Sequence, residues 1–258
     1  MTWAERRKIT YALLVLIMVG GVAFLAIRNA VTVEPTCYDK KKNGDEIGVD
    51  CGGSCAYYCQ NELADPKVRW QRVYEITPGV AYAIAYIEHS SPNAAARNVQ
   101  YQFKVYDDKN TLITERTGTT FLGPMGQSAI VETLIPVGNV RPSRVLFSFT
   151  SPIQWEKIPS TFSSVVIKTD RNYLEQYSGG TRLTATLENK SRFSFSKLDV
   201  VAILYDKNGN TITTSKVLLP SLPALQSKVV YFTWPTSITN AARVEIIPRF
   251  NPFTADES

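Results

Sequence analysis

Two stretches of this chain carry the same residues at a nearly constant spacing. A shift of 99 residues aligns Tyr106-Asp107 with Tyr205-Asp206, Ile113-Thr114 with Ile212-Thr213, Pro124 with Pro223, Gln127-Ser128 with Gln226-Ser227, Val131 with Val230, Pro136 with Pro235, and Arg144-Val145 with Arg243-Val244. A shift of 100 continues the match upstream, where Ala83, Ala85 and Ile87 align with Leu183, Ala185 and Leu187. A fixed internal period is the signature of a duplicated structural unit. We therefore expect two copies of one domain.

Both copies have the pattern of β-structure. Residues 101–106 alternate between apolar and polar side chains, as do residues 164–168 and 243–247 less cleanly, and no stretch past residue 60 sustains a helical period. A copy of roughly 90 residues matches an immunoglobulin-like sandwich of about seven strands. The sequence thus predicts an all-β fold of two tandem immunoglobulin-like β-sandwiches over residues 65–158 and 159–253, followed by a tail over residues 254–258.

Each copy contains a hairpin turn rich in Asp, Asn and Gly, at residues 106–110 and 205–210. The second turn resembles a calcium loop because Asp206, Asn208 and Asn210 alternate. However, its glycine is at the fourth position rather than the sixth, and position twelve is Val217. Turn formation is the better interpretation.

An uncharged apolar run occupies residues 9–27 and follows Arg6-Arg7-Lys8. Nineteen helical residues span roughly 28 Å, close to the hydrocarbon thickness of a bilayer. Basic residues on the N-terminal side favour a cytoplasmic N-terminus. We therefore predict a cytoplasmic tail (1–8), a single-pass transmembrane anchor (9–27) and a C-terminal region outside the cytoplasm. A cleaved signal peptide and a buried core helix are the alternatives.

The net charge of +5 comes partly from this N-terminal flank, where residues 5–8 contribute +2. The rest of the excess is spread over 250 residues, whereas nucleic-acid binding needs a clustered basic stripe. We expect no nucleic-acid partner.

All four cysteines lie in a polar stalk predicted over residues 28–64, at Cys37, Cys51, Cys55 and Cys59. An even number of cysteines in an exported protein indicates disulfides, here two, with three possible pairings. Each closed loop would contribute about 3 kcal/mol in the chain-entropy model. We expect these crosslinks to hold a segment that cannot build an apolar core.

Metal binding is the alternative for this segment. Four thiolates can hold zinc, but the first cysteine stands alone rather than in a C-x2-C pair. Calcium is the second, weak candidate, and its ligands would be Asp39, Asn43, Asp45, Glu46 and Asp50, although their spacing is not that of an EF-hand. A redox-active pair is disfavoured by the C-x3-C spacing. We predict no metal and no cofactor.

Residues 37–55 resemble a cysteine motif of bacterial surface proteins, including those of candidate phyla, with the pattern C-x-D-G-x-x-N-G-x-E-x-x-x-D-C-G-G-x-C-x-x-C. The chain departs from it at Lys40, where the motif has Gly, and at Cys59, which comes one residue late. The resemblance implies a protein exposed at the cell envelope and supplies no catalytic residue.

The two copies resemble the FxLYD family of small extracytoplasmic sandwiches, named for a Phe-x-Leu-Tyr-Asp motif. The first copy reads Phe103-Lys104-Val105-Tyr106-Asp107 and the second Ala202-Ile203-Leu204-Tyr205-Asp206, so each departs at one position. Ser91-Pro92-Asn93 is also faintly similar to the Asn-Pro-Asn of desiccation-related sandwiches. The resemblance implies the fold and leaves activity open.

The sequence offers little for catalysis. His89 is the only histidine, it falls at the end of a predicted strand, and the second copy has Asn189 there. No nucleophile elbow, zinc-protease helix, phosphate loop or dinucleotide fingerprint occurs. Trp70, Trp155 and Trp234 are candidates for a sugar-binding face, with core packing as the alternative.

Together these features predict a non-catalytic, membrane-anchored binding or scaffold protein whose sandwiches meet envelope or surface proteins. The alternative function is carbohydrate binding at the cell surface. The ligand-binding residues are not predicted.

Overall fold

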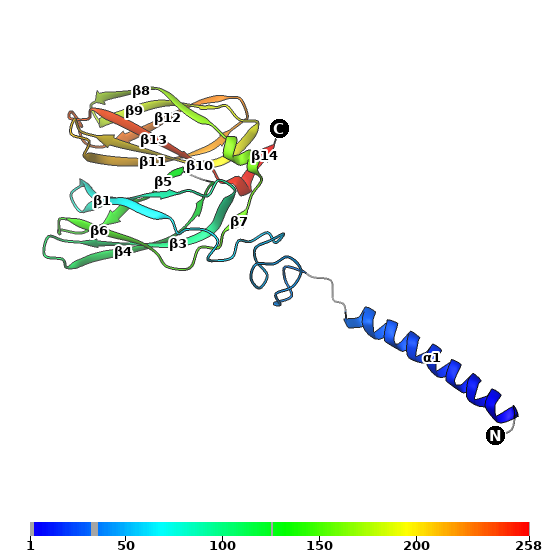
Figure 1. Cartoon of the computed structure of the whole chain (residues 1–258). Helices are drawn as coiled ribbons and strands as arrows, with labels where there is room; N and C mark the ends of the chain where they lie inside the picture. The colour runs from blue at the N-terminus through cyan, green and yellow to red at the C-terminus, as the bar shows by residue number, and fades with distance from the viewer. Residues whose placement is uncertain (1–2, 32–35, 125, 258) are drawn as a thin grey trace. The chain divides into compact units, whose positions relative to one another are not determined.

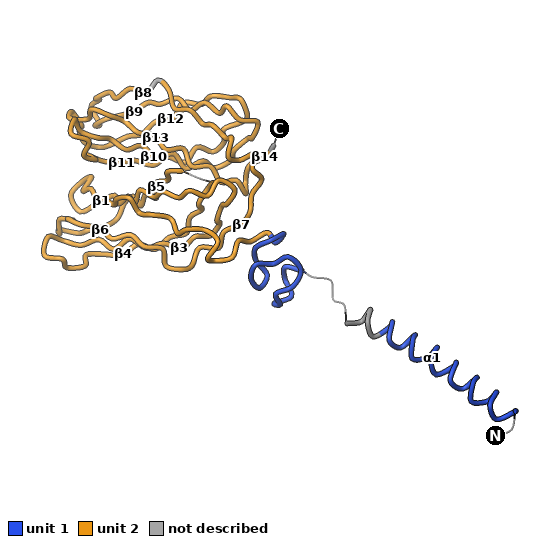
Figure 2. The backbone as a smooth tube through the Cα atoms, in the orientation of Figure 1, with its two compact units in different colours: residues 1–55 blue, residues 56–258 orange. Residues whose placement is uncertain are grey.

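The computed structural model describes residues 3–31, 36–124 and 126–257 (Figure 1). Small parts of the predicted cytoplasmic tail (1–2), stalk (32–35) and C-terminal tail (258) lie outside these residues. The chain divides into two compact units, residues 1–55 and 56–258 (Figure 2). Both sandwiches therefore belong to one unit.

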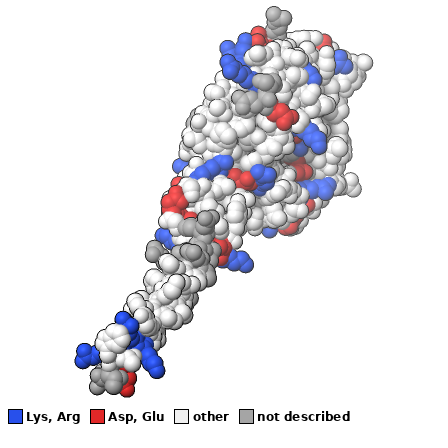
Figure 3. Space-filling view, turned by 90° about the vertical axis from the view of Figure 1, so that its right-hand side faces the viewer, with Lys and Arg blue, Asp and Glu red and all other residues white. Residues whose placement is uncertain are grey.

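The first unit begins with helix α1 (Trp3–Val31), which contains the predicted anchor and extends into the predicted tail. Its segment Trp3–Ala26 has a mean hydropathy of 2.5 and is long and apolar enough to cross a membrane. The side chains described in this segment are exposed within its own unit, whereas those of a core helix are mostly buried. Lys and Arg gather at the N-terminal end of α1, whereas both signs of charge are interspersed over the second unit (Figure 3).

The second unit contains two series of antiparallel strands, and each strand of the second series begins about 100 residues after its counterpart in the first. The first series is β1 (Lys67–Thr77), β2 (Val80–His89), β3 (Ala94–Tyr106), β4 (Leu112–Leu122), β5 (Gly126–Pro136), β6 (Arg144–Phe149) and β7 (Glu156–Lys157). After the short helix η1 (Ser160–Ser164), the second is β8 (Ile167–Tyr177), β9 (Gly180–Asn189), β10 (Phe193–Tyr205), β11 (Thr211–Leu222), β12 (Ser227–Trp234), β13 (Arg243–Arg249), helix η2 (Pro252–Thr254) and β14 (Ala255–Glu257). The strand bounds thus follow the sequence repeat.

Each series folds into two facing sheets. Repeat 1 has sheet A1, in the order β1-β2-β5, and sheet B1, in the order β4-β3-β6 with β7 paired to β3. Repeat 2 has the corresponding sheets A2 (β8-β9-β12) and B2 (β11-β10-β13, with β14 paired to β10). Figure 1 shows the four sheets stacked in the order B1, A1, B2 and A2. The structure confirms the predicted tandem β-sandwich.

Successive side chains of a β-strand point to opposite faces of the sheet, so every second residue faces the core of its sandwich. Phe103 and Val105 of β3 face Ala83 and Ala85 of β2 across the repeat 1 core. In repeat 2, Leu183 of β9 belongs to the corresponding buried core, together with Trp234, which is 1% exposed. Large apolar side chains interdigitated at this density supply most of the favourable free energy of folding.

The predicted hairpin turns are closed by aspartate side chains. Asp107 Oδ1 accepts hydrogen bonds from the backbone N–H groups of Lys109 (2.9 Å) and Thr111 (2.7 Å). Asp206 Oδ1 accepts the equivalent pair from Asn208 and Asn210, both at 2.8 Å. In the second turn the carboxylate therefore caps backbone amides, which is the turn chemistry predicted from the sequence.

The two sandwiches dock through sheets A1 and B2. A third apolar cluster lies between them and joins side chains of β2 and β5 to side chains of β10 and β13: Ile84, Tyr86, Ala129, Val131, Val201, Ile203, Tyr205 and Ile247. Strands β2 and β10 are consequently buried on both faces, with odd positions of β2 in the repeat 1 core and even positions against repeat 2. The repeats are packed as one body.

Arg249 pairs several polar groups at this junction. Arg249 is 6% exposed and donates to Ser128 Oγ (3.0 Å), Thr120 Oγ1 (2.7 Å), the Phe121 carbonyl (2.9 Å) and Asp199 Oδ2 (3.2 Å). Burial lowers the pKa of the Arg249 guanidinium, and Asp199 opposes this effect. A buried cation with all these partners fixes the register between the repeats.

Candidate functional site

All four cysteines are disulfide-bonded, which confirms the sequence prediction. Cys37 is joined to Cys55, and Cys51 and Cys59 are also in disulfides. The described residues contain no free cysteine. A sulfur held in a disulfide is not a thiolate ligand, so the zinc alternative does not fit these residues.

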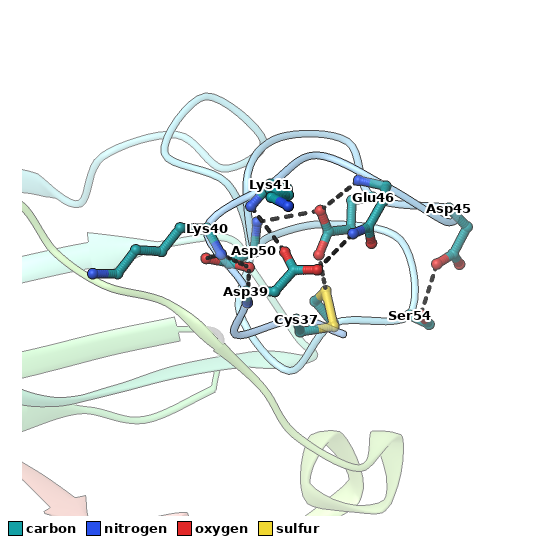
Figure 4. The surroundings of a disulfide bond; sticks show 10 residues. Cys37, Asp39, Lys40, Lys41, Asp45, Glu46, Asp50 and Ser54 are labelled. Atoms are coloured by element: carbon teal, nitrogen blue, oxygen red, sulfur yellow. Dashed lines mark hydrogen bonds between the residues drawn. A yellow bond between two sulfur atoms is a disulfide. The ribbon is translucent and has the colours of Figure 1, made fainter. Parts of the chain in front are cut away.

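The acidic residues of the same segment close its loop (Figure 4). Asp50 accepts hydrogen bonds from the backbone N–H groups of Asp39 (3.0 Å) and Lys40 (3.0 Å). The buried Glu46 carboxylate accepts from the N–H groups of Asn43 (3.2 Å) and Asp50 (3.3 Å). Charge-assisted bonds of this kind order a polar loop that has no apolar core.

Two further contacts use the remaining carboxylates. Asp39 Oδ2 accepts from Asn43 Nδ2 at 2.7 Å, and Asp45 Oδ1 accepts from the Ser54 hydroxyl at 2.7 Å. Within the residues that the structure describes, only Cys37, Glu46 and Cys55 place three such ligand atoms within 4.8 Å of one another, and the two cysteines are bonded together. Of the acidic calcium candidates, only Glu46 belongs to such a group within the described residues.

Thiol labelling measures the disulfides directly. We expect the intact mass to show no modified cysteine after alkylation of the denatured chain without reductant, and four after reduction, because all four cysteines are oxidised. Labelling of any cysteine before reduction would contradict the disulfide assignment.

His89 ends β2 and is 7% exposed. Its ring lies 5.2 Å from the Trp155 ring, and its Nδ1 atom is buried without a hydrogen-bond partner among the described residues. Burial lowers the pKa of His89, and a hydrogen bond to the Gly123 backbone opposes the shift. No side-chain hydrogen bond from a described residue reaches this imidazole, which packs at the end of repeat 1.

Asn189 occupies the counterpart position in repeat 2 and is fully bonded. Its Nδ2 donates to the carbonyls of Phe193 (2.7 Å) and Pro223 (3.0 Å), and its Oδ1 accepts from the Ser191 hydroxyl (2.7 Å). The residue at this strand end therefore ties the adjacent turns together.

His89 predicts a dependence of stability on pH. Because its folded pKa is lowered, the unfolded chain binds more protons below about pH 6.5, and the free energy of unfolding falls as pH decreases. We expect the wild type to lose more stability between pH 7 and pH 5 than His89→Asn, as measured by urea unfolding. An equal loss of unfolding free energy in both proteins would show that His89 does not contribute to the pH dependence of stability.

The three tryptophans proposed for a sugar-binding face differ in burial. Trp155 and Trp234 are 3% and 1% exposed and belong to apolar clusters. Trp70 of β1 is half-buried and stacks on Tyr86 with ring centroids 5.0 Å apart, at the rim of the junction between the repeats. Core packing is the correct interpretation for two of the three.

Trp70 also lines a cleft between the repeats. The cleft has a volume of about 200 Å³ and is lined by Trp70 and Arg72 of β1 and, from repeat 2, by Tyr205, Gly209, Asn210 and Thr211. The Tyr205 ring is covered by the Arg243 guanidinium at 3.6 Å, and its hydroxyl donates to Glu245 at 2.7 Å. Residues far apart in sequence thus form one small polar and aromatic site.

Next to this cleft, the Tyr74 hydroxyl is buried beside Thr211 and makes no hydrogen bond of normal geometry to a described residue. Burial raises the pKa of Tyr74 to about 12, so the phenol stays protonated at neutral pH. A buried hydroxyl without a partner of normal geometry is uncommon in folded proteins.

Sheet A2 exposes the face that its counterpart A1 buries. Tyr173 of β8 and Tyr231 of β12 flank Thr184 of β9 in register, and the two tyrosines are 56% and 57% exposed. In A1 the equivalent row contains Ile84 and Val131, which are covered by B2. The sequence reasoning missed these tyrosines, although the alternation Arg182-Leu183-Thr184-Ala185-Thr186 already shows a polar outer face.

No family model and no curated protein sequence matches this chain. Among solved structures, it is similar to the N-terminal CBM22-1-CBM22-2 tandem domain from Paenibacillus barcinonensis Xyn10C. The similarity covers 76% of this chain and 89% of that chain, with 8% sequence identity and a TM-score of 0.17. At this score the similarity carries no argument about function.

Proposed function

We propose that the protein is a membrane-anchored, extracytoplasmic binding protein whose docked sandwiches present the outer face of sheet A2 to envelope proteins. Helix α1 would hold it in the membrane and the disulfide-tied segment would serve as a spacer. In this proposal the protein performs no catalysis.

The observation that carries the proposal is the contrast between the two A sheets. The outer face of A1 is covered by repeat 2, whereas the equivalent face of A2 exposes Tyr173, Tyr231 and Val229 around Thr184 and Thr186. Tyrosine is enriched in protein interfaces because a large apolar ring is combined with a polar tip. An open, rigid three-stranded face with two exposed rings has the character of a partner surface.

The charged groups on this face support recognition rather than general adhesion. Arg182 lies 3.5 Å from Glu175 and 5.1 Å from the Tyr177 ring, beside the tyrosine row. Fixed charges around an aromatic centre favour a partner of complementary charge and oppose others.

The location and the lack of catalysis rest on separate observations. The disulfides indicate an oxidising compartment, and the basic flank of α1 favours a cytoplasmic N-terminus. His89 is the only imidazole of the sequence, and it is buried against Trp155 rather than exposed for acid–base chemistry. Carbohydrate binding, the alternative function, stays a prediction for the cleft between the repeats.

Position-specific crosslinking in intact cells tests the partner surface. A photoreactive amino acid at position 231 should give a discrete crosslinked protein, and the same residue at position 119, on the outer face of sheet B1, should not. Protease added outside the cytoplasmic membrane should digest the sandwiches and spare the N-terminal flank. Equal crosslinking at both positions, or protected sandwiches, would overturn the proposal.

A further inference from the structure

We propose that the cleft between β1 of repeat 1 and the β10–β11 turn of repeat 2 binds one acidic sugar unit, a pyranose that carries a carboxylate. This inference goes beyond the partner surface on sheet A2 and gives the carbohydrate-binding alternative a site and a ligand class.

The size of the cleft limits the occupant. Its volume is about 200 Å³, below the roughly 300–1,000 Å³ of sites that hold drug-sized ligands. A nucleotide cofactor or a folded peptide segment is too large, whereas a single sugar ring is of the appropriate scale.

The wall of the cleft supplies an aromatic surface and hydrogen-bonding groups, the two kinds of contact that a sugar ring makes. Trp70 is half-buried, is held in place by stacking on Tyr86 and contributes an aromatic surface to the cleft. Thr211 and Asn210 at the opposite wall bring a hydroxyl and an amide, and the Nδ2 of this amide also donates to Asp206 Oδ2 at 3.0 Å. Sites for small polar ligands combine apolar or aromatic walls with a few placed hydrogen-bonding groups in this way.

The carboxylate is inferred from Arg72. This side chain is exposed, lines the cleft and donates from Nη1 to the Gln71 carbonyl at 2.9 Å. No carboxylate within the described part of the chain lies within 4.0 Å of its guanidinium. By contrast, Arg243, which covers the ring of the cleft residue Tyr205, is already paired with Glu245 at 3.3 Å. Arg72 is therefore the cation that remains available, and a guanidinium pairs best with a planar oxyanion.

The site occurs once in the chain, although the fold occurs twice. The positions equivalent to Trp70 and Arg72 in β8 are Asp170 and Tyr173, as the pairing with β9 shows. Sheet A2 has no second sandwich docked on it in the described structure, so no turn faces β8 as the β10–β11 turn faces β1. Docking of the repeats creates the cleft.

Binding is tested on the full-length protein in nanodiscs of zwitterionic lipid, which avoids competing sugar detergents. Ligand-observed saturation-transfer NMR would use three probes: glucuronate, glucose, which lacks the carboxylate, and acetate, which lacks the ring. We expect glucuronate to bind and Arg72→Gln to weaken it by about tenfold, the factor for loss of one charge-assisted contact. Arg192→Gln, at an exposed arginine in the β9–β10 turn, should leave binding unchanged.

Trp70→Ala should abolish binding of glucuronate, and Trp70→Phe should restore part of it, because the phenyl ring keeps the stacking surface. The far-UV spectrum of each variant checks that the fold is retained. Equal binding of acetate, equal binding of glucose, an unchanged affinity in Arg72→Gln or no binding of glucuronate would each overturn the inference. Crosslinking from position 231 is independent of these results, so failure of the sugar site and failure of the partner surface are distinguishable.

Discussion

Ile84→Asp is expected to lower the free energy of unfolding by more than about 4 kcal/mol, because the new carboxylate is buried without a partner. Ile84 is fully buried between sheets A1 and B2, where its neighbours in the cluster include Val131, Val201 and Ile203. These side chains offer no donor to the charge. Urea unfolding of the full-length protein in detergent, followed by far-UV circular dichroism, measures the change.

The matched control is Thr184→Asp at the equivalent position of repeat 2. Thr184 is half-buried between Tyr173 and Tyr231 on the face of sheet A2 that no second sandwich covers in the described structure. We expect a cost of about 1 kcal/mol, mainly from the low strand propensity of Asp. Similar costs for the two substitutions would show that the repeats do not dock through sheet A1.

Arg249→Ala is expected to lower the free energy of unfolding by about 3–5 kcal/mol, the cost of removing one partner of a buried ion pair. The substitution leaves Thr120 Oγ1, the Phe121 carbonyl, Ser128 Oγ and Asp199 without their shared donor. The Asp199 side chain is 28% exposed, so water can solvate its carboxylate after the guanidinium is removed. We therefore expect a loss of stability near about 3 rather than 5 kcal/mol. The same urea titration measures it.

Arg144→Ala provides the control for loss of a guanidinium. Arg144 is exposed and stacks on Tyr106 at 5.0 Å, a contact worth about 1 kcal/mol or less. A loss for Arg249→Ala as small as that for Arg144→Ala would mean that the buried cation does not hold the repeats together.

The fold was predictable because its signals are local. The repeat spacing, the two-residue alternation of β3 and the Asp-rich turns each act over a few residues, and the strands follow them. The cysteines were predictable for a similar reason, since their number and their position after an apolar segment indicate oxidation. The acidic residues between them have a ligand-like composition, but the loop uses them to cap its own amides.

The candidate sites were not predictable from single motifs. Arg72 is an unremarkable exposed arginine in sequence, and only docking of the repeats brings it to Asn210 and Thr211. Tyr173 and Tyr231 are 58 residues apart in the chain. They lie on either side of Thr184 only because the strand order is β8-β9-β12. Trp70 was proposed for sugar binding on its residue type, together with two tryptophans that proved to be core residues.

By itself, the sequence determined an apolar helix, an oxidised cysteine segment and two sandwiches built from one repeated pattern. It also contains a sign of docking: residues 80–87 and 198–205 are almost continuously apolar, whereas their counterparts at 180–187 and 99–106 alternate between apolar and polar side chains. Such runs mark strands that are buried on both faces, but they do not say what covers the second face. The tertiary structure decided that sheet A1 packs on sheet B2, because contact between sheets depends on surfaces assembled from several strands.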